Sequence, residues 1–418
     1  FDQCATVPHK ALKLSFSFHI HTHMDNDEAV RRCREGGTFL ALDVPPGSEF
    51  GIDQNMWICA VNFKGIKMIP PGFHYIRWRN SQNKPSSVIS GQNADRVSVV
   101  GENNSFLPLM GCFAFIKPSQ IFVLRWDASI EDLVPLTEEE SERYQQGVRR
   151  MEFDPFLAAF PFGDTFTAWK ELTKHISDNT LDRNAPRSNK ERQVQYLEDQ
   201  ALVQARLVQE WETFISNHAN KEEGTPIENT QTAYMQDFRY ESIPQRWIPH
   251  NESSCQGSDR TKYFMDKSYL LDHLINSKYG TWEELIGEFQ FSFICFWLGE
   301  SYESFEHWKQ LMILFCNCDI SISEHPEWWK EILQTIEKQM LIVPQDFFVD
   351  ILSSKNFLEP SLKNLFSILD NYASELPLSS SYESLKSTIE QRFQRKFTPP
   401  SPFEFDSDDE DAPTIVEL

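Results

Sequence analysis

Histidine and cysteine side chains could bind a metal in this chain, so their spacing comes first. His19, His21 and His23 alternate, as ligands on one face of a strand would, but no matching ligand motif stands nearby. We expect these three histidines to be solvated. Cys316 and Cys318 would need two further ligands to hold zinc, so buried thiols at a helix end are the preferred interpretation.

Paired carboxylates could act as a general acid and a general base. Asp346 and Asp350 lie one helical turn apart. They follow Pro344, however, and acidic residues stabilise the positive end of a helix dipole without any catalytic role. The helix-start interpretation is therefore preferred.

Two further histidines need an explanation. His307 is expected to lie exposed on a helix, paired with Glu303 four residues earlier. His74 lies in a predicted strand and could ligate metal in a cupin-like barrel, although no second ligand stands at suitable spacing. The chain also has no glycine-rich phosphate loop, no nucleophile elbow and no H-E-x-x-H motif. The sequence therefore predicts no catalytic residue, no metal and no cofactor.

Composition favours a protein-binding function over a nucleic-acid-binding one. The 418 residues include 62 acidic and 39 basic side chains, a formal net charge of −23. Phosphate binding needs a concentrated basic face, and no long basic run is present. The acidic excess suits basic protein partners. Eight cysteines in a chain of this length predict free thiols in a reducing compartment.

Residues 38–127 show the pattern of short strands separated by turns. Two Pro-Pro-Gly turns stand at 45–47 and 70–72, and residues 112–127 predict a hairpin with Lys117 to Gln120 as its turn. A β-sandwich or small barrel fits this segment.

Helical periodicity takes over after Val134. Thr137 with Glu140, and Thr281 with Glu284, have the spacing of capping boxes. The segment 289–298 is apolar apart from two residues. It would rise only about 15 Å as a helix, roughly half the thickness of a bilayer core. It is therefore predicted to be the central helix of a packed bundle.

The chain ends differ from the interior. Residues 1–23 lack the features of a signal peptide, and Met24 resembles a natural start, so 1–23 is expected to be a non-native or disordered extension. Near the other end, Ser407 stands in an acidic run and suits an acid-directed kinase. The last six residues form a candidate partner-binding strand, with a frayed terminus as the alternative: Pro413, Thr414, Ile415, Val416, Glu417 and Leu418.

The predicted fold class is α+β and multidomain. An N-terminal β-sandwich-like domain precedes an all-helical C-terminal domain and an acidic tail. The first three predicted divisions are the extension at 1–23, a β-sandwich-like domain at 24–134 and a helical connection at 135–175. A linker and variable insertion follows at 176–262 and contains one predicted helix near 196–215. The helical domain spans 263–397, and the tail with its terminal strand spans 398–418.

Six stretches of the chain form a distinctive set when taken together: "LDVPPGSEFGID", "FKGIKMIPPGFHYI", "FVLRWD", "GEFQFSFICFWLGESYESFEHWKQLM", "VPQDFFVDILSSKNFL" and "APTIVEL". In this set the chain resembles the A1-cistron splicing factor family, the assembly factors of the U5 small nuclear ribonucleoprotein. The resemblance runs in order from about Met24 to Leu418, but is poor over about 176–240 and absent from 1–23.

This resemblance implies a helical C-terminal domain of VHS-like architecture and no catalysis. It implies binding to the large U5 scaffold protein, at its ribonuclease H-like domain, in a precursor particle. It further implies exclusion of the U5 RNA helicase and release linked to phosphorylation. We expect a cytoplasmic and also nuclear monomer that binds neither nucleic acid nor membrane directly.

Two other functions remain open at this point. A metal-dependent β-barrel enzyme with a helical appendage would use His74 and the N-terminal histidines. A peptide-binding VHS-like adaptor would use the helical domain, an interpretation that rests on fold analogy alone.

Overall fold

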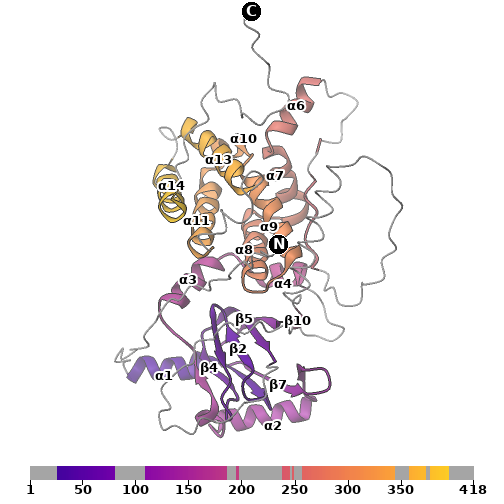
Figure 1. Ribbon diagram of the computed structural model, residues 1–418, viewed down its shortest axis with the longest axis vertical. Coiled ribbons are helices and arrows are strands. Elements are labelled where there is room, and N and C mark those ends of the chain that lie inside the picture. The colour runs from indigo at the N-terminus through magenta and orange to yellow at the C-terminus, as the bar shows by residue number, and fades with distance from the viewer. Residues whose placement is uncertain are drawn as a thin grey trace, which may run out of the picture.

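The structure is a computed structural model that describes residues 26–80, 109–185, 194–196, 238–244, 247–248, 257–343, 357–372 and 377–394. Figure 1 shows a β domain at one end of the molecule and a helical domain at the other. This confirms the predicted α+β class, with the strands first and the helical bundle after them. Among the described residues, no helix is long and apolar enough to cross a membrane.

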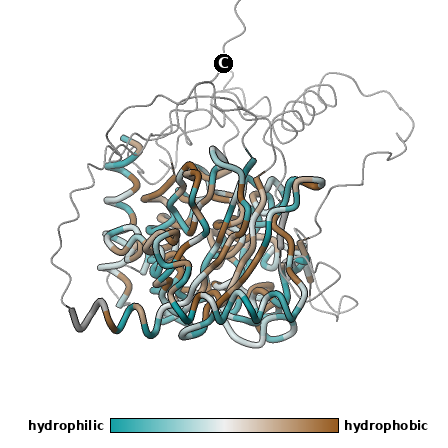
Figure 2. Tube along the Cα trace, turned by 90° about the horizontal axis from the view of Figure 1, so that it is seen from below, coloured by the Kyte–Doolittle hydropathy of each residue, from teal (hydrophilic) through white to brown (hydrophobic). Residues whose placement is uncertain are grey.

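The β domain contains two five-stranded sheets. The first has the order β8-β7-β1-β4-β9, from Asp132–Pro135, Ile121–Asp127, Gly37–Leu42, Gly65–Ile69 and Ala158–Ala159. The second has the order β10-β6-β5-β2-β3, from Val194–Tyr196, Met110–Ile116, Gly72–Arg79, Glu49–Ile52 and Asn55–Ile58. Seen from the β-domain end, hydrophobic residues concentrate along the strands (Figure 2).

The predicted hairpin at 112–127 is wrong, although its turn is present. β6 pairs with β5 in the second sheet, whereas β7 runs parallel to β1 in the first. The turn, closed by the Gln120 N–H donating to the Lys117 carbonyl (3.1 Å), therefore carries the chain from one sheet to the other. Both strands are apolar enough for either arrangement, and local pattern does not specify the partner strand.

The two sheets pack face to face between helix α2 (Glu138–Arg149) on one side and the helical domain on the other. Helix α2, capped by Thr137 as predicted, covers the outer face of the first sheet through Tyr144 and Val148. The inner faces of the two sheets share one core, which includes Phe50 and Trp78. The outer face of the second sheet packs on the helical domain. The second sheet is thus covered on both faces, which is why β5 is buried along almost its whole length.

The helical domain is built around α8 (Trp282–Trp297), which is capped by Thr281. Every residue from Leu285 to Cys295 is buried, which confirms the predicted central helix. The surrounding helices are α7 (Ser268–Leu274, continued by a π-helical turn to Tyr279), α9 (Tyr302–Phe315), α10 (Asp319–Glu324), α11 (Pro326–Ile342), α13 (Leu358–Tyr372) and α14 (Ser379–Phe393), with α6 (Gly257–Met265) preceding them.

The chain between the two domains belongs partly to each. Helices α3 (Asp164–Leu172) and α4 (Asp178–Asn184) contribute Trp169, Leu172 and Leu181 to the core of the helical domain. The Trp169 indole also donates a hydrogen bond to the Phe73 carbonyl of β5 (2.9 Å). In Figure 1, α3 lies between the sheets and the bundle.

Candidate interaction site

The residues predicted to bind a partner lie outside the described part of the chain. This holds for the terminal strand Pro413–Leu418 and for Ser407. It holds equally for the three N-terminal histidines, for Asp346 and Asp350, and for residues 197–215 of the predicted linker helix. These predictions are not tested by the structure.

His74 is a buried structural residue. Its Nδ1 lies 2.8 Å from Asp53 Oδ2, and its Nε2 lies 2.8 Å from the Pro70 carbonyl oxygen. The other Asp53 oxygen accepts the Tyr75 backbone N–H (3.1 Å). Burial raises the pKa of Asp53, and His74 opposes that rise. Because both ring nitrogens have partners, His74 has no nitrogen left for a metal.

His307 is buried, so the predicted exposed pair with Glu303 is wrong. Its Nε2 lies 2.7 Å from Glu288 Oε1, and its ring stacks on Tyr240 at 4.3 Å. The Tyr240 segment and α8 together cover the face of α9 that was predicted to meet solvent. Tyr240 is far away in sequence, so the helical pattern of α9 alone gives no sign of it.

Glu288 is the centre of this buried polar network. Besides His307, it accepts the Tyr279 hydroxyl (2.7 Å) and the Arg183 guanidinium (2.8 Å). Burial alone would raise the pKa of Glu288, but His307, Tyr279 and Arg183 together lower it. The network joins α4, the π-helical turn, α8 and α9, and every polar atom of the carboxylate is used within the fold. It is a structural brace, not a catalytic pair.

Five of the six cysteines that the structure describes are buried thiols. All six described cysteines are free, and only Cys33 is exposed. Burial raises the pKa values of Cys316 and Cys318, which disfavours the thiolate that zinc requires. No group of three or more metal-ligating side chains occurs among the residues that the structure describes.

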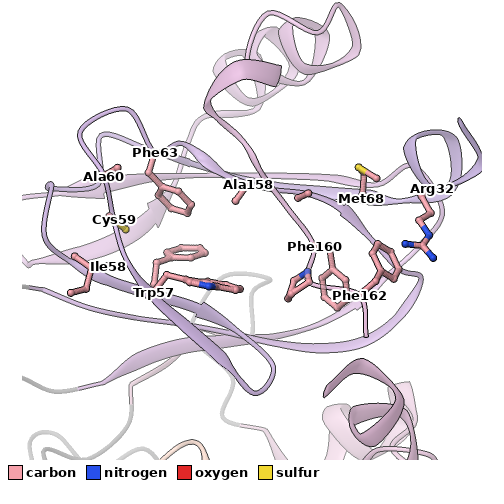
Figure 3. Close-up of a pocket in the computed structure, with 13 residues that line it drawn as sticks. Arg32, Trp57, Ile58, Cys59, Ala60, Phe63, Met68, Ala158, Phe160 and Phe162 are labelled. Carbon is pink, nitrogen blue, oxygen red and sulfur yellow. The ribbon is translucent and has the colours of Figure 1, made fainter. Parts of the chain in front are cut away.

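The β domain contains an apolar pocket of about 540 Å³. Five aromatic rings contribute to its lining: Phe50, Trp57, Phe63, Phe160 and Phe162. Figure 3 shows Trp57 and Phe63 at one end, and Phe160 and Phe162 at the other, with Arg32 of α1 (Asn26–Glu35) beside Phe162. The guanidinium carbon of Arg32 lies 3.7 Å from the centre of the Phe162 ring, a cation–π contact.

The pocket lies where both sheets end on the same side. β3 is the edge of the second sheet and β9 is the edge of the first. Trp57 comes from β3, while Ala158 and Ala159 form β9 and continue into Phe160 to Phe162. The Phe160 N–H donates to the Lys67 carbonyl (2.9 Å), which holds this segment along β4. One wall of the pocket is therefore the chain that leads from the β domain to α3.

Sequence reasoning missed this pocket. The available signal was the run from Leu157 to Phe162, in which two small residues precede two phenylalanines around a proline. The sequence of that run shows neither a strand period nor a helix period, and in the structure only two of its residues pair with β4. Its partners Phe50 and Trp57 stand about a hundred residues earlier, so the pocket appears only in the folded chain.

Comparisons with known proteins cover both domains. A family model described as the AAR2 N-terminal domain matches residues 35–186, and one described as the AAR2 C-terminal repeat region matches residues 240–398.

Relatives match over nearly the full chain. A Mus musculus protein named Protein AAR2 homolog is 31% identical over 406 residues, covering 94% of this chain and 97% of the relative. The Homo sapiens protein of the same name is 30% identical over 412 residues with the same coverage. A Caenorhabditis elegans relative is 29% identical over 349 residues, covering 80% of this chain and 86% of its own. The chain therefore belongs to the AAR2 family, the A1-cistron splicing factor family.

Proposed function

We propose that this protein is a non-catalytic assembly factor that binds the large scaffold protein of the U5 small nuclear ribonucleoprotein in a precursor particle. The observation that supports this most is membership of a splicing-factor family across both domains. Family membership supports a role in splicing and in ribonucleoprotein assembly. Binding at the scaffold's ribonuclease H-like domain, and exclusion of the U5 RNA helicase, are the specific steps that we propose.

Charge supports a protein partner that is itself basic. The net charge of −23 would attract an RNA-binding scaffold and repel RNA. A bound acidic factor would then delay premature RNA contacts, and would act by preferring the immature particle over the mature one. We propose that it acts as a monomer in the cytoplasm and also in the nucleus.

The terminal residues Pro413–Leu418 are the proposed partner-binding strand. Thr414, Ile415 and Val416 are β-branched, which favours an extended strand that adds to a sheet edge of the scaffold. Ser407 is the proposed phosphosite for release. A phosphate there would add about −1.5 to −2 charges beside the existing acidic run.

Affinity purification from cytoplasmic extract tests the proposal. We expect the full chain to recover the U5 scaffold without the helicase, and a chain ending at Glu410 to lose the scaffold. Ile415→Pro removes one backbone donor from the proposed strand, whereas Ile415→Val keeps it, so only the proline variant should bind weakly. Recovery of no splicing component by the full chain would contradict the proposed function.

Release is tested separately with Ser407→Asp. We expect its binding to the purified scaffold to be weaker than that of Ser407→Ala at the same salt concentration. Equal binding by the two variants across a salt series would remove Ser407 as the switch.

A further inference from the structure

Backbone groups at the rim of the β-domain pocket are placed for pairing with another strand. The Cys59 N–H donates to the Ser48 carbonyl (2.7 Å), and the Gly47 N–H donates to the Cys59 carbonyl (2.9 Å). Backbone bonding alternates along an antiparallel strand, so Trp57 also faces β2 while Met56 and Ile58 direct their N–H and C=O groups outward. In the described chain, no strand pairs with that outer edge of β3.

Side chains at the same rim are apolar and exposed. Ile58, which lines the pocket, is 45% exposed, and Val61, next in sequence to the lining residue Ala60, is 80% exposed. Covering such exposed apolar side chains with another apolar surface removes them from water, which favours binding. The rim and the pocket thus form one continuous apolar surface beside an open strand edge.

We propose that this pocket binds an extended apolar segment of a protein partner, which pairs with the edge of β3 and inserts side chains between Trp57 and Phe160. An added strand would form hydrogen bonds with the outward N–H and C=O groups of β3. Alternate residues of a strand point to the same face, so every second side chain of the added strand would point toward the pocket. A volume of about 540 Å³ lies within the range of ligand-binding clefts.

Arg32 lies against Phe162 at one end of the pocket, and Arg31 and Arg34 are on the same helix. Asp27, Glu28 and Glu35 of α1 balance these three basic side chains, so the helix has no formal net charge. The pocket therefore selects an incoming segment by its apolar side chains and its backbone, not by its charge. The inference goes beyond the proposed function, because it concerns a different part of the chain from the terminal strand.

Synthetic peptides test the inference on the full chain. The probe is a fluorescein-labelled octapeptide of alternating valine and phenylalanine with a glutamate at each end. A second probe carries N-methyl groups on alternate amides, which removes the donors for strand pairing and keeps the side chains. We expect saturable binding of the first probe and at least roughly ten-fold weaker binding of the second.

Matched variants locate the binding. Ala158→Phe places a ring in the pocket mouth at an exposed position, and Ala128→Phe makes the same change at an exposed position that does not line the pocket. Ile58→Pro removes one outward N–H, and Ile58→Val retains it. We expect Ala158→Phe and Ile58→Pro to weaken binding at least roughly ten-fold, and both controls to stay within about two-fold. Melting temperatures of all four variants identify any that fail to fold.

Several outcomes would overturn the inference. Equal binding of the two probes would exclude strand addition, and unchanged binding by Ala158→Phe would exclude the pocket. Binding of the dye anilinonaphthalene sulfonate without binding of the peptide would indicate a small apolar ligand. Tighter probe binding by a chain ending at Glu410 would indicate that the protein's own terminus occupies the pocket, and dimerisation that Ala158→Phe abolishes would indicate a second copy. None of these results depends on whether the U5 scaffold is the partner.

Discussion

At the residue scale, Glu288 carries the buried charge on which the centre of the helical domain depends. Its carboxylate holds His307, Tyr279 and Arg183 from three different elements. Removing one member of a buried ionic network leaves the other members desolvated and unpaired. Glu288→Gln keeps the shape of the side chain and removes the charge, so we expect it to lower the free energy of unfolding by about 3 kcal/mol at neutral pH. Urea denaturation measures the change.

The pH dependence of this loss follows from the lowered pKa of Glu288. A carboxylate whose pKa is lower in the folded state stabilises the fold above its unfolded pKa, near 4.5, and loses that contribution as pH falls through the folded value. The difference between wild type and Glu288→Gln should therefore shrink below about pH 4.5. Glu306→Gln, in a partly exposed pair with Lys309, is the control and should cost about 0.5 kcal/mol. A pH-independent difference for Glu288→Gln would contradict the ionic explanation.

At the element scale, Gly287 sets how closely α8 approaches the turn before α4. A Cβ at this position would collide with the carbonyl oxygen of His175 and lie 2.9 Å from Thr180 Oγ1. Alanine favours a helix over glycine by about 1 kcal/mol, but a clash with fixed backbone outweighs that gain. We expect Gly287→Ala to reduce the free energy of unfolding by about 2 kcal/mol, as measured in urea.

Gly147 of α2 provides the comparison. A Cβ there would meet only side-chain atoms, the nearest being those of Phe153 and Glu152, which can rotate away. Gly147→Ala should therefore change stability by less than about 1 kcal/mol in either direction. If the two variants behave alike, the close approach of α8 to His175 does not explain the glycine.

The same scale shows what the sequence could predict. The capping residues Thr137 and Thr281 and the fully apolar α8 follow local rules, and the structure confirms them. The hairpin at 112–127 and the exposed His307 were wrong because each depends on a distant partner, β1 in one case and Tyr240 in the other. The pocket was missed for the same reason, since its two walls come from edges of different sheets. Local pattern thus specified elements, and long-range packing specified the candidate site.

At the scale of the whole molecule, the β domain and the helical domain share a continuous core. Phe113 of β6 meets Phe291 of α8 edge to face at 4.9 Å, and Phe73 stacks on Trp169 at 5.8 Å. A large apolar contact of this kind opposes independent domain motion. We therefore expect the two domains to unfold as one cooperative unit.

Arg77 is a buried polar contact across this interface, beside the partly exposed pair of Arg79 with Glu300. It is buried on β5 and donates to the Leu298 carbonyl at the end of α8 (3.0 Å) and to the Asp53 carbonyl in the β2–β3 turn (3.1 Å). Arg77→Met keeps much of the apolar volume but leaves both carbonyls without this donor, at a cost of about 2 kcal/mol. Because the lost bond to Leu298 joins the two domains, we expect the variant to uncouple their unfolding as well as to weaken the fold.

Differential scanning calorimetry distinguishes uncoupling from simple destabilisation. Wild type should unfold in one endotherm whose calorimetric and van't Hoff enthalpies agree, whereas Arg77→Met should unfold in two. The control is Arg125→Met on β7, whose partners Asp43, Glu140 and Tyr144 all belong to the β domain, so its endotherm should stay single. A single endotherm for Arg77→Met would mean that the contacts that remain, the aromatic pairs and the Arg79–Glu300 ion pair among them, are enough to couple the domains. Two endotherms in wild type would mean that the shared core does not couple them at all.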